Sequence, residues 1–232
     1  MLKKVLVNIL IVIFFITGAY FVTMPLVGRI YFDRSVKLEA DKKLAEAIAE
    51  CKKAMRLDPL EARYRAQLGG LYIKDARANK NSGSWEMARE AYGKAKELNP
   101  LSAKYRLGWA EAEAILILTS KDMSGERFAR YKDELKKAIE LDPNGYFTNA
   151  YYGYYMLRFR GRLSQKELNY VIYRLRHALE LNPRYANEIY ATLAHKLDSF
   201  DLLQKITPDK PEWQARLVKF MRKIDYWKYR GR

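Results

Sequence analysis

The sequence contains very little cysteine and histidine, with one cysteine and two histidines in 232 residues. A single cysteine excludes an intramolecular disulfide framework, and no paired Cys/His spacing indicates zinc or haem. His177 and His195 have no serine, cysteine or metal-type partner nearby in the sequence, so neither is predicted to be catalytic. Cys51 is expected to be a small core residue rather than a reactive thiol.

The sequence motifs of common enzymes are missing as well. There is no glycine-rich phosphate loop, no nucleophile elbow and no candidate triad. The sequence therefore predicts a protein that is not an enzyme, with no catalytic residues, no cofactor and no metal site.

Acidic residues are few relative to basic ones, 27 against 43, which gives a formal net charge of +16. Such an excess suits anionic headgroups, an acidic protein partner or a nucleic-acid backbone. Residues 1–28 hold no acids, but the acids of the remaining chain are interleaved with the basic residues, which argues against a dedicated nucleic-acid groove.

The most informative positive feature is a short phrase that occurs four times, ending at Pro59, Pro100, Pro143 and Pro183. In each copy, Leu-Asp or Leu-Asn precedes the proline, and an alanine lies five residues before it. The proline ends a helix, and the alanine permits close approach of a neighbour. The four alanines predicted to be buried are Ala54, Ala95, Ala138 and Ala178.

The prolines are 41, 43 and 40 residues apart, a spacing typical of stacked helical hairpins. Counting back from Pro100 places Ala88, Tyr92 and Ala95 at the small and aromatic positions of a second helix. After Pro59, Leu68, Gly69 and Tyr72 form the signature of a first helix. The pattern resembles the tetratricopeptide repeat (TPR), whose usual period is about 34 residues. The same comparison gives further matches at Ala47, Cys51, Ala54, Tyr152, Gly153 and Met156, and a looser one at Leu107 and Gly108.

The resemblance implies an all-α, right-handed solenoid of about four long repeats, which we assign to residues 28–207. Each repeat is longer than the usual period, and its extra residues lie between its first and second helix. The extra residues either lengthen both helices or enlarge the loop, as in the polar segments 79–84, 120–126 and 160–164. Ser164 and Glu167 match a capping box, which predicts that a helix begins there.

Residues 1–27 are predicted to be a transmembrane anchor, because residues 5–27 carry no charge and about 20 apolar residues span a bilayer. A cleaved signal peptide is the alternative. Lys3 and Lys4 precede the span, which favours an N-in, C-out orientation. The expected localisation is a single-pass inner or plasma membrane protein with periplasmic repeats, and a cytoplasmic orientation is the alternative.

Residues 208–232 are predicted to form a basic amphipathic helix that caps the solenoid, with an outer face suited to an anionic membrane or nucleic acid. The residues of this basic face are Arg216, Lys219, Arg222, Lys223, Lys228 and Arg230.

The TPR resemblance also implies a partner-binding groove lined by the first helix of each repeat. Gly70, Glu111 and Tyr154 occupy the positions at which a chaperone-tail clamp needs asparagine, so that clamp is not expected. The tyrosines of residues 150–162 suit either a partner surface or simple packing. The predicted groove residues are Arg63, Lys74, Lys104, Phe147, Tyr154 and Arg158.

The sequence as a whole predicts a membrane-anchored TPR scaffold, an assembly factor or accessory subunit of a membrane complex. Its expected partners are proteins, in particular membrane-bound subunits, and the lipid bilayer through residues 5–27. A basic repeat protein that binds nucleic acid or an anionic membrane surface is the alternative, with nucleic acid the less favoured ligand.

Overall fold

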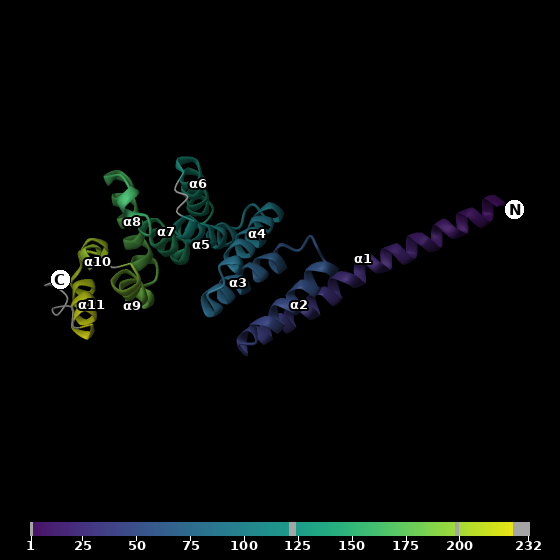
Figure 1. Cartoon of the computed structure of the whole chain (residues 1–232), viewed down its shortest axis with the longest axis horizontal. Coiled ribbons are helices and arrows are strands. Elements are labelled where there is room, and N and C mark those ends of the chain that lie inside the picture. Colours follow the sequence, from purple (N-terminus) through teal and green to yellow (C-terminus); the bar gives the residue numbers. More distant parts are fainter. Residues whose placement is uncertain (1, 121–123, 198–199, 225–232) are drawn as a thin grey trace. The chain divides into compact units, whose positions relative to one another are not determined.

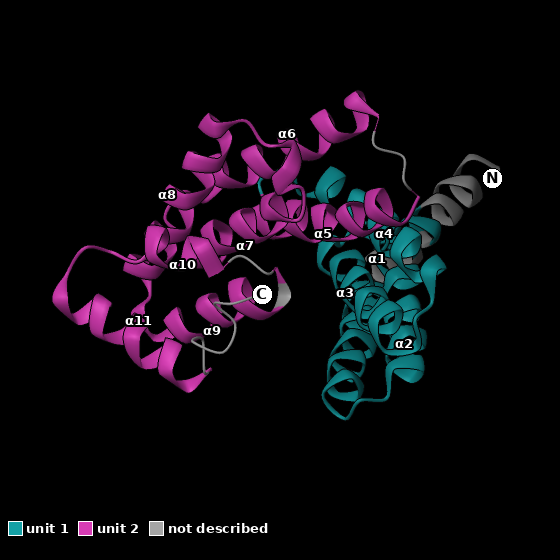
Figure 2. Ribbon diagram, turned by 60° about the vertical axis from the view of Figure 1, so that its left-hand side comes forward, with its two compact units in different colours: residues 1–101 teal, residues 102–232 magenta. Residues whose placement is uncertain are grey.

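The computed structural model describes residues 2–120, 124–197 and 200–224. All regular elements of these residues are helices (Figure 1). The chain divides into two compact units, residues 1–101 and 102–232 (Figure 2). The helices of the first unit are α1 (Leu2–Ala40), α2 (Leu44–Leu57), α3 (Ala62–Asn79) and α4 (Ser82–Leu98).

The second unit contains three long helices and several short ones. Its long helices are α5 (Ala103–Ser120), α6 (Gly125–Leu141) and α8 (Gln165–Leu181). The short elements are α7 (Tyr146–Leu157), η1 (Arg160–Arg162), η2 (Pro183–Tyr185), α9 (Ala186–Ala191), η3 (Thr192–Lys196), α10 (Phe200–Ile206) and α11 (Pro211–Lys223).

Consecutive helices pack as hairpins. In the first unit α1 packs on α2 and α3 on α4; in the second unit α5 packs on α6 and α7 on α8. In the second unit the first helices of the two hairpins, α5 and α7, also lie beside each other. This order of contacts is that of a helical-hairpin solenoid, as the sequence predicts.

The four copies of the repeated phrase end their helices in one backbone conformation. Asp58, Asn99, Asp142 and Asn182 have φ of −137°, −134°, −142° and −144°, and each N–H donates to the carbonyl of the repeated alanine. The chain leaves the helix at this residue because the following proline has no N–H to continue it. One sequence phrase therefore specifies one local structure four times.

The predicted small positions lie inside the hairpins. All four repeated alanines are fully buried, which confirms the register of the repeats. Gly69 and Gly153 permit close approaches between helices: a Cβ at Gly69 would lie 2.6 Å from the Tyr92 ring, and one at Gly153 would lie 2.5 Å from Leu175. Only glycine fits where the facing side chain touches the helix backbone.

Most of the extra residues of each repeat lengthen the helices. α3 and α5 have 18 residues each, and α4 and α6 have 17. Lys80 and Asn81 alone separate α3 from α4, so much of the predicted polar loop 79–84 is helical. The fourth hairpin differs: α7 has 12 residues and is followed by the 3₁₀ turn η1. There the predicted capping box of Ser164 and Glu167 begins α8.

The C-terminal part departs from the repeat after Pro183, where the sequence match is weak. A short α9 continues into the π-helical turn η3 in place of one long first helix. α11 buries Trp213, Leu217 and Phe220, and the Phe220 ring lies 5.4 Å from that of Tyr190 in α9. α11 thus buries one apolar face in the second unit, and its role as a cap stays a prediction.

α1 corrects one sequence prediction. Within the described part of the chain, no helix combines the length and the apolar character needed to cross a bilayer. The predicted localisation as a single-pass membrane protein, anchored through residues 1–27, is therefore wrong. The apolar residues do not form a separate segment, because the helix continues beyond Gly28 to Ala40 and packs on α2 as the first helix of a hairpin.

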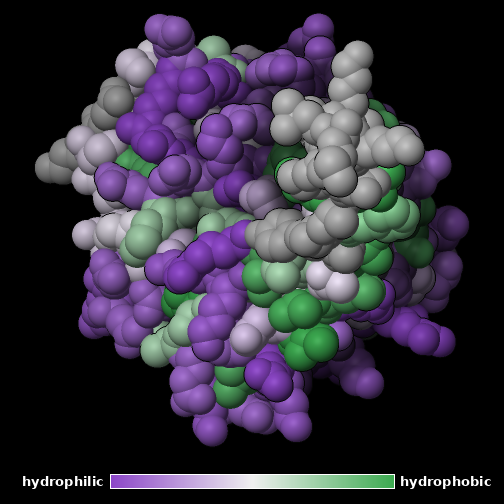
Figure 3. Space-filling view, turned by 90° about the vertical axis from the view of Figure 1, so that its right-hand side faces the viewer, coloured by the Kyte–Doolittle hydropathy of each residue, from purple (hydrophilic) through white to green (hydrophobic). Residues whose placement is uncertain are grey.

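The N-terminal part of α1 still presents apolar side chains to the surface. Figure 3 views the molecule from the side of the N-terminal end and shows hydrophobic residues in green on the visible face. Among the α1 side chains that the structure describes, the exposed large apolar ones are Ile11, Ile13, Phe14, Phe15, Val22, Leu26, Val27, Ile30 and Val36.

Candidate protein-binding surface

The second unit carries an aromatic surface at the start of α7. It consists of Tyr146, Phe147 and Tyr151 on α7 and of Tyr185 in the turn after α8. The Tyr146 and Tyr185 rings stack with centroids 4.6 Å apart. The centroids of the Phe147 and Tyr151 rings are 5.4 Å apart. Phe147 is 51% exposed and Tyr185 37% exposed, which is unusual for large aromatic side chains in contact with each other. We refer to these four residues as the aromatic surface.

Buried tyrosines on the inner side of α7 fix the helix in place. The Tyr155 hydroxyl donates to the Glu111 carboxylate of α5 at 2.7 Å. The Tyr131 hydroxyl of α6 donates to the Tyr155 carbonyl at 2.7 Å. Burial raises the pKa of both phenols well above the usual value, so both stay protonated as donors. Some aromatic side chains of α7 therefore pack inside the second unit, and others are exposed on its surface.

The predicted groove residues of the second unit differ in their exposure. Phe147 belongs to the aromatic surface, and Tyr151 links it to Tyr154 at a centroid distance of 5.7 Å. Tyr154 is half-buried with its hydroxyl bonded to Thr192, and burial raises its pKa. Arg158 is half-buried at the C-terminal end of α7. Lys104 is exposed in the first turn of α5.

The two predicted groove residues of the first unit form ion pairs with nearby glutamates. Arg63 Nη2 lies 2.8 Å from Glu61, at the start of α3. Lys74 Nζ lies 2.5 Å from Glu39 of α1, which places this side of α3 against α1. Arg63 and Lys74 remain predicted partner contacts, because ion pairs of this kind also occur where a side chain has only a structural role.

The basic face of the C-terminal helix is exposed where the structure describes it. Lys219, Arg222 and Lys223 lie on the surface of α11. Arg216 donates to the Pro183 carbonyl at 2.9 Å and lies over the Trp213 ring, so it helps to hold α11 in place. Lys228 and Arg230 lie outside the described residues.

The sequence did not point to Tyr185. It follows Pro183 in the last copy of the repeated phrase, and only the return of the chain beside α7 brings it next to Tyr146. Within the described residues, no cluster of three His, Cys, Asp or Glu side chains is placed to hold a metal ion.

Solved structures with a similar fold are TPR proteins. A scan of protein-family models and a search of curated protein sequences give no match. MamA from Desulfovibrio magneticus RS-1 is 16% identical, with 84% of this chain and 96% of that chain covered and a TM-score of 0.53. PilF of Pseudomonas aeruginosa is 17% identical, with 88% of each chain covered and a TM-score of 0.53.

A third similar structure is YrrB, described as a TPR protein with an unusual peptide-binding site. It is 18% identical, with 82% of this chain and 90% of that chain covered and a TM-score of 0.50. Identities of this size show the fold alone. The protein therefore has a TPR-like fold, which the repeated phrase predicts.

Proposed function

We propose that this protein is an interaction scaffold that binds a partner protein on the first helices of its hairpins. The observation that carries the proposal is the aromatic surface, where exposed Phe147 and Tyr185 adjoin half-buried Tyr146 and Tyr151. Rigid aromatic side chains supply large contact areas at a low entropic cost, and they are enriched at the energetic centres of protein interfaces.

The position of the surface supports this function. α7 is a first helix, and hydrogen bonds from Tyr155 and Tyr131 hold it beside α5 and α6. Its exposed aromatics are therefore preorganised for a partner. The peptide-binding site named for YrrB belongs to that protein, and it supports the proposal only as a property that this fold can carry. The scaffold would act as an assembly or accessory subunit of a multiprotein complex.

Site-specific photo-cross-linking tests the proposal. A benzophenone amino acid at Phe147 should capture a partner in cells, and Tyr185→Ala should reduce the yield. The matched control is the same amino acid at Tyr173, an aromatic residue of α8 that is 54% exposed. Equal capture of the same protein at both positions would contradict the assignment to α7.

A second candidate function rests on a different cluster. Along α8, Tyr170 stacks on Tyr173, and the Tyr173 ring lies parallel to that of His177 with centroids 6.0 Å apart. The Arg174 guanidinium lies 4.8 Å from the centre of the Tyr170 ring. Aromatic rings interleaved with arginine are typical of surfaces that bind single-stranded nucleic acid.

A salt series decides this alternative. Binding of a random single-stranded oligonucleotide should weaken steeply with salt and should fall further in Tyr173→Ala. No binding at low salt would remove nucleic acid as a ligand.

A further inference from the structure

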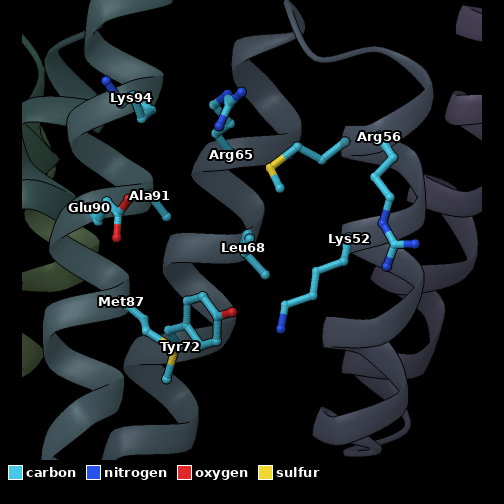
Figure 4. Close-up of a pocket in the computed structure, with 10 residues that line it drawn as sticks. Lys52, Arg56, Arg65, Leu68, Tyr72, Met87, Glu90, Ala91 and Lys94 are labelled. Atoms are coloured by element: carbon cyan, nitrogen blue, oxygen red, sulfur yellow. The ribbon is translucent and has the colours of Figure 1, made fainter.

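The first unit contains a concave site that is separate from the aromatic surface. A cavity of about 360 Å³ lies between α2, α3 and α4 (Figure 4). Its size is near the lower end of the range of ligand pockets, which is about 300 to 1,000 Å³. It has room for a large apolar side chain and the adjoining backbone of a peptide, but not for a bulky cofactor.

The floor of this pocket is apolar. Leu68 and Tyr72, one turn apart on α3, are buried in the hairpin and line the cavity. Ala91 of α4 adds a small side chain, and Met55 and Met87 add flexible thioethers on either side. Methionine adapts its shape to different apolar ligands. The floor therefore favours an apolar side chain without selecting one shape.

The rim is strongly basic. Lys52 and Arg56 of α2, Arg65 of α3 and Lys94 of α4 line the pocket, against the single acid Glu90. The Lys52 ammonium lies 5.7 Å from the centre of the Tyr72 ring, directly beside the apolar floor. Within the described residues, neither Lys52 nor Arg56 makes an ion pair, whereas Lys94 pairs with the exposed Glu97 of the same helix at 3.0 Å. Charge complementarity therefore calls for an anionic ligand.

The positions of these charges distinguish a peptide from a single small anion. Lys52 and Arg56 lie one turn apart on α2, and Lys94 lies on α4 (Figure 4). These cations lie on two sides of the floor, on α2 and on α4, instead of converging on one point. Several carboxylates on both sides of an apolar group match this arrangement better than one carboxylate or phosphate does.

The pocket also differs in location from the groove predicted by the sequence. Lys74 and Gln67 of α3 both contact Glu39 of α1. Leu68 and Tyr72 line the cavity with residues of α2 and α4, the second helices of two successive hairpins. A ligand in this pocket would thus leave the contact between α1 and α3 undisturbed.

We propose that this pocket binds an acidic segment of a partner protein, with one apolar side chain seated on Leu68 and Tyr72 and flanking carboxylates paired with Lys52, Arg56 and Lys94. The site is independent of the aromatic surface, because the two lie in different units. A partner could engage either surface alone, and two sites would let the scaffold hold two segments.

Fluorescence anisotropy with the full chain tests the proposal. The probe is a labelled peptide, Glu-Glu-Leu-Phe-Glu-Glu, compared with Gln-Gln-Leu-Phe-Gln-Gln and Glu-Glu-Gly-Ser-Glu-Glu. We expect binding of the first peptide only. Lys52→Met with Arg56→Met should weaken it about tenfold or more, which corresponds to about 1.4 kcal/mol. Ala91→Phe, which fills the floor without changing the charge, should weaken it as well.

Two control variants separate this site from the other surfaces. Lys74→Met removes one positive charge from α3, the helix that carries the pocket floor, at a position outside the pocket, and should leave peptide binding unchanged. Phe147→Ala tests the aromatic surface and should also leave it unchanged. Circular dichroism and urea unfolding show which variants are folded, and binding is compared only among these.

Three results would overturn the proposal. Equal binding of the glycine-serine peptide would show a general attraction between charges. An equal loss in Lys74→Met would show that the pocket is not the site. Binding of labelled decanoate, without any binding of the acidic peptide, would show that the pocket takes small amphipathic anions and not a protein segment. None of these results bears on the aromatic surface.

Discussion

The hairpin of α3 and α4 and the hairpin of α5 and α6 have similar helix lengths and end in the same backbone conformation, but different contacts hold their helices together. In the first, Gly69 lets the Tyr92 ring lie against the backbone of α3. In the second, two ion pairs join the helices: Arg106 with Glu134, and Arg127 with Glu113, each with N and O atoms 2.6 Å apart.

This difference shows that the repeated phrase specifies the helix ends and not the interior. Apolar packing at Gly69 depends on volume, because any side chain there must displace a ring. The ion pairs of the other hairpin depend on both partners being present, because Glu113 is only 1% exposed and a single buried charge is costly. Different kinds of substitution should therefore destabilise the two hairpins: added volume in the first, and loss of one charge in the second.

The largest effect is expected from Glu134→Leu, which leaves the Arg106 guanidinium inside the hairpin without its carboxylate. We expect a loss of about 3 kcal/mol in the free energy of unfolding, measured with urea. The double variant Glu134→Leu with Arg106→Met should recover most of this loss, since it removes both charges. Equal instability of the single and double variants would show that volume, and not charge, controls this hairpin.

The next effect concerns the packed hairpin. Gly69→Ala should destabilise the protein by about 1 to 3 kcal/mol, because the new Cβ collides with the buried Tyr92 ring. The control is its neighbour Gly70, where an added Cβ has its nearest contact at 3.4 Å. Gly70→Ala should be neutral, or stabilising by up to about 1 kcal/mol, because alanine favours the helix. Thermal unfolding that ranks the two variants in the opposite order would contradict the tight contact.

A smaller effect is expected from Glu167, which caps α8 and pairs with Lys132 of α6 at 2.7 Å. Glu167→Gln should cost about 1 kcal/mol at neutral pH through the loss of the charged hydrogen bonds from Lys132 and Ser164, because glutamine can still occupy the capping position. The hydrogen bond from Lys132, followed by those from Ser164, lowers the pKa of Glu167 from 4.5 to about 2. A depressed carboxylate pKa stabilises the fold above the unfolded value and loses this contribution as the pH falls.

The pH dependence gives the measurement for Glu167. The difference between the wild type and Glu167→Gln should be largest near neutral pH and should shrink between about pH 4.5 and 2. Glu180→Gln, an exposed glutamate of the same helix, is the control and should show a smaller change. A difference that stays constant with pH would exclude the ionised carboxylate as its source.

The smallest effect should come from Lys137→Gln on α6, where Lys137 pairs with Asp133 on the surface at 2.6 Å. Both side chains are about half exposed, so water replaces the lost interaction. We expect a change below about 0.5 kcal/mol by urea unfolding. Asp133 directly precedes Glu134, so this variant and Glu134→Leu compare an exposed and a buried pair on one helix. Similar losses for both would contradict the dependence on burial.

Local patterns in the sequence were sufficient to predict the fold. The prolines end helices, Ser164 and Glu167 begin one, and the buried alanines give the register, because each signal acts within a turn or two of the chain. The structure of residues 5–27 does not follow from local sequence alone, because a hydrophobic run does not show whether its helix continues into a hairpin. Ser35 was missed for a similar reason, since only the structure shows its hydroxyl donating to the Ala47 carbonyl at 2.8 Å.

The candidate sites were predicted less completely. The repeat register placed Phe147 at an exposed position of a first helix, where it is exposed, and its role as a partner contact stays a prediction. Tyr185, the buried ion pairs and the pocket between α2 and α4 were not found, because their members come from different helices.

The sequence by itself determined where the helices end and which small residues face their neighbours, since backbone hydrogen bonds and proline act locally. Only the tertiary structure decided which contacts, apolar packing or ion pairs, hold the two helices of each hairpin together. Charges such as Lys52 and Lys94 are 42 residues apart in the sequence, and they share a pocket only because α3 packs between them. Long-range packing sets such neighbours, and no single stretch of the chain encodes them.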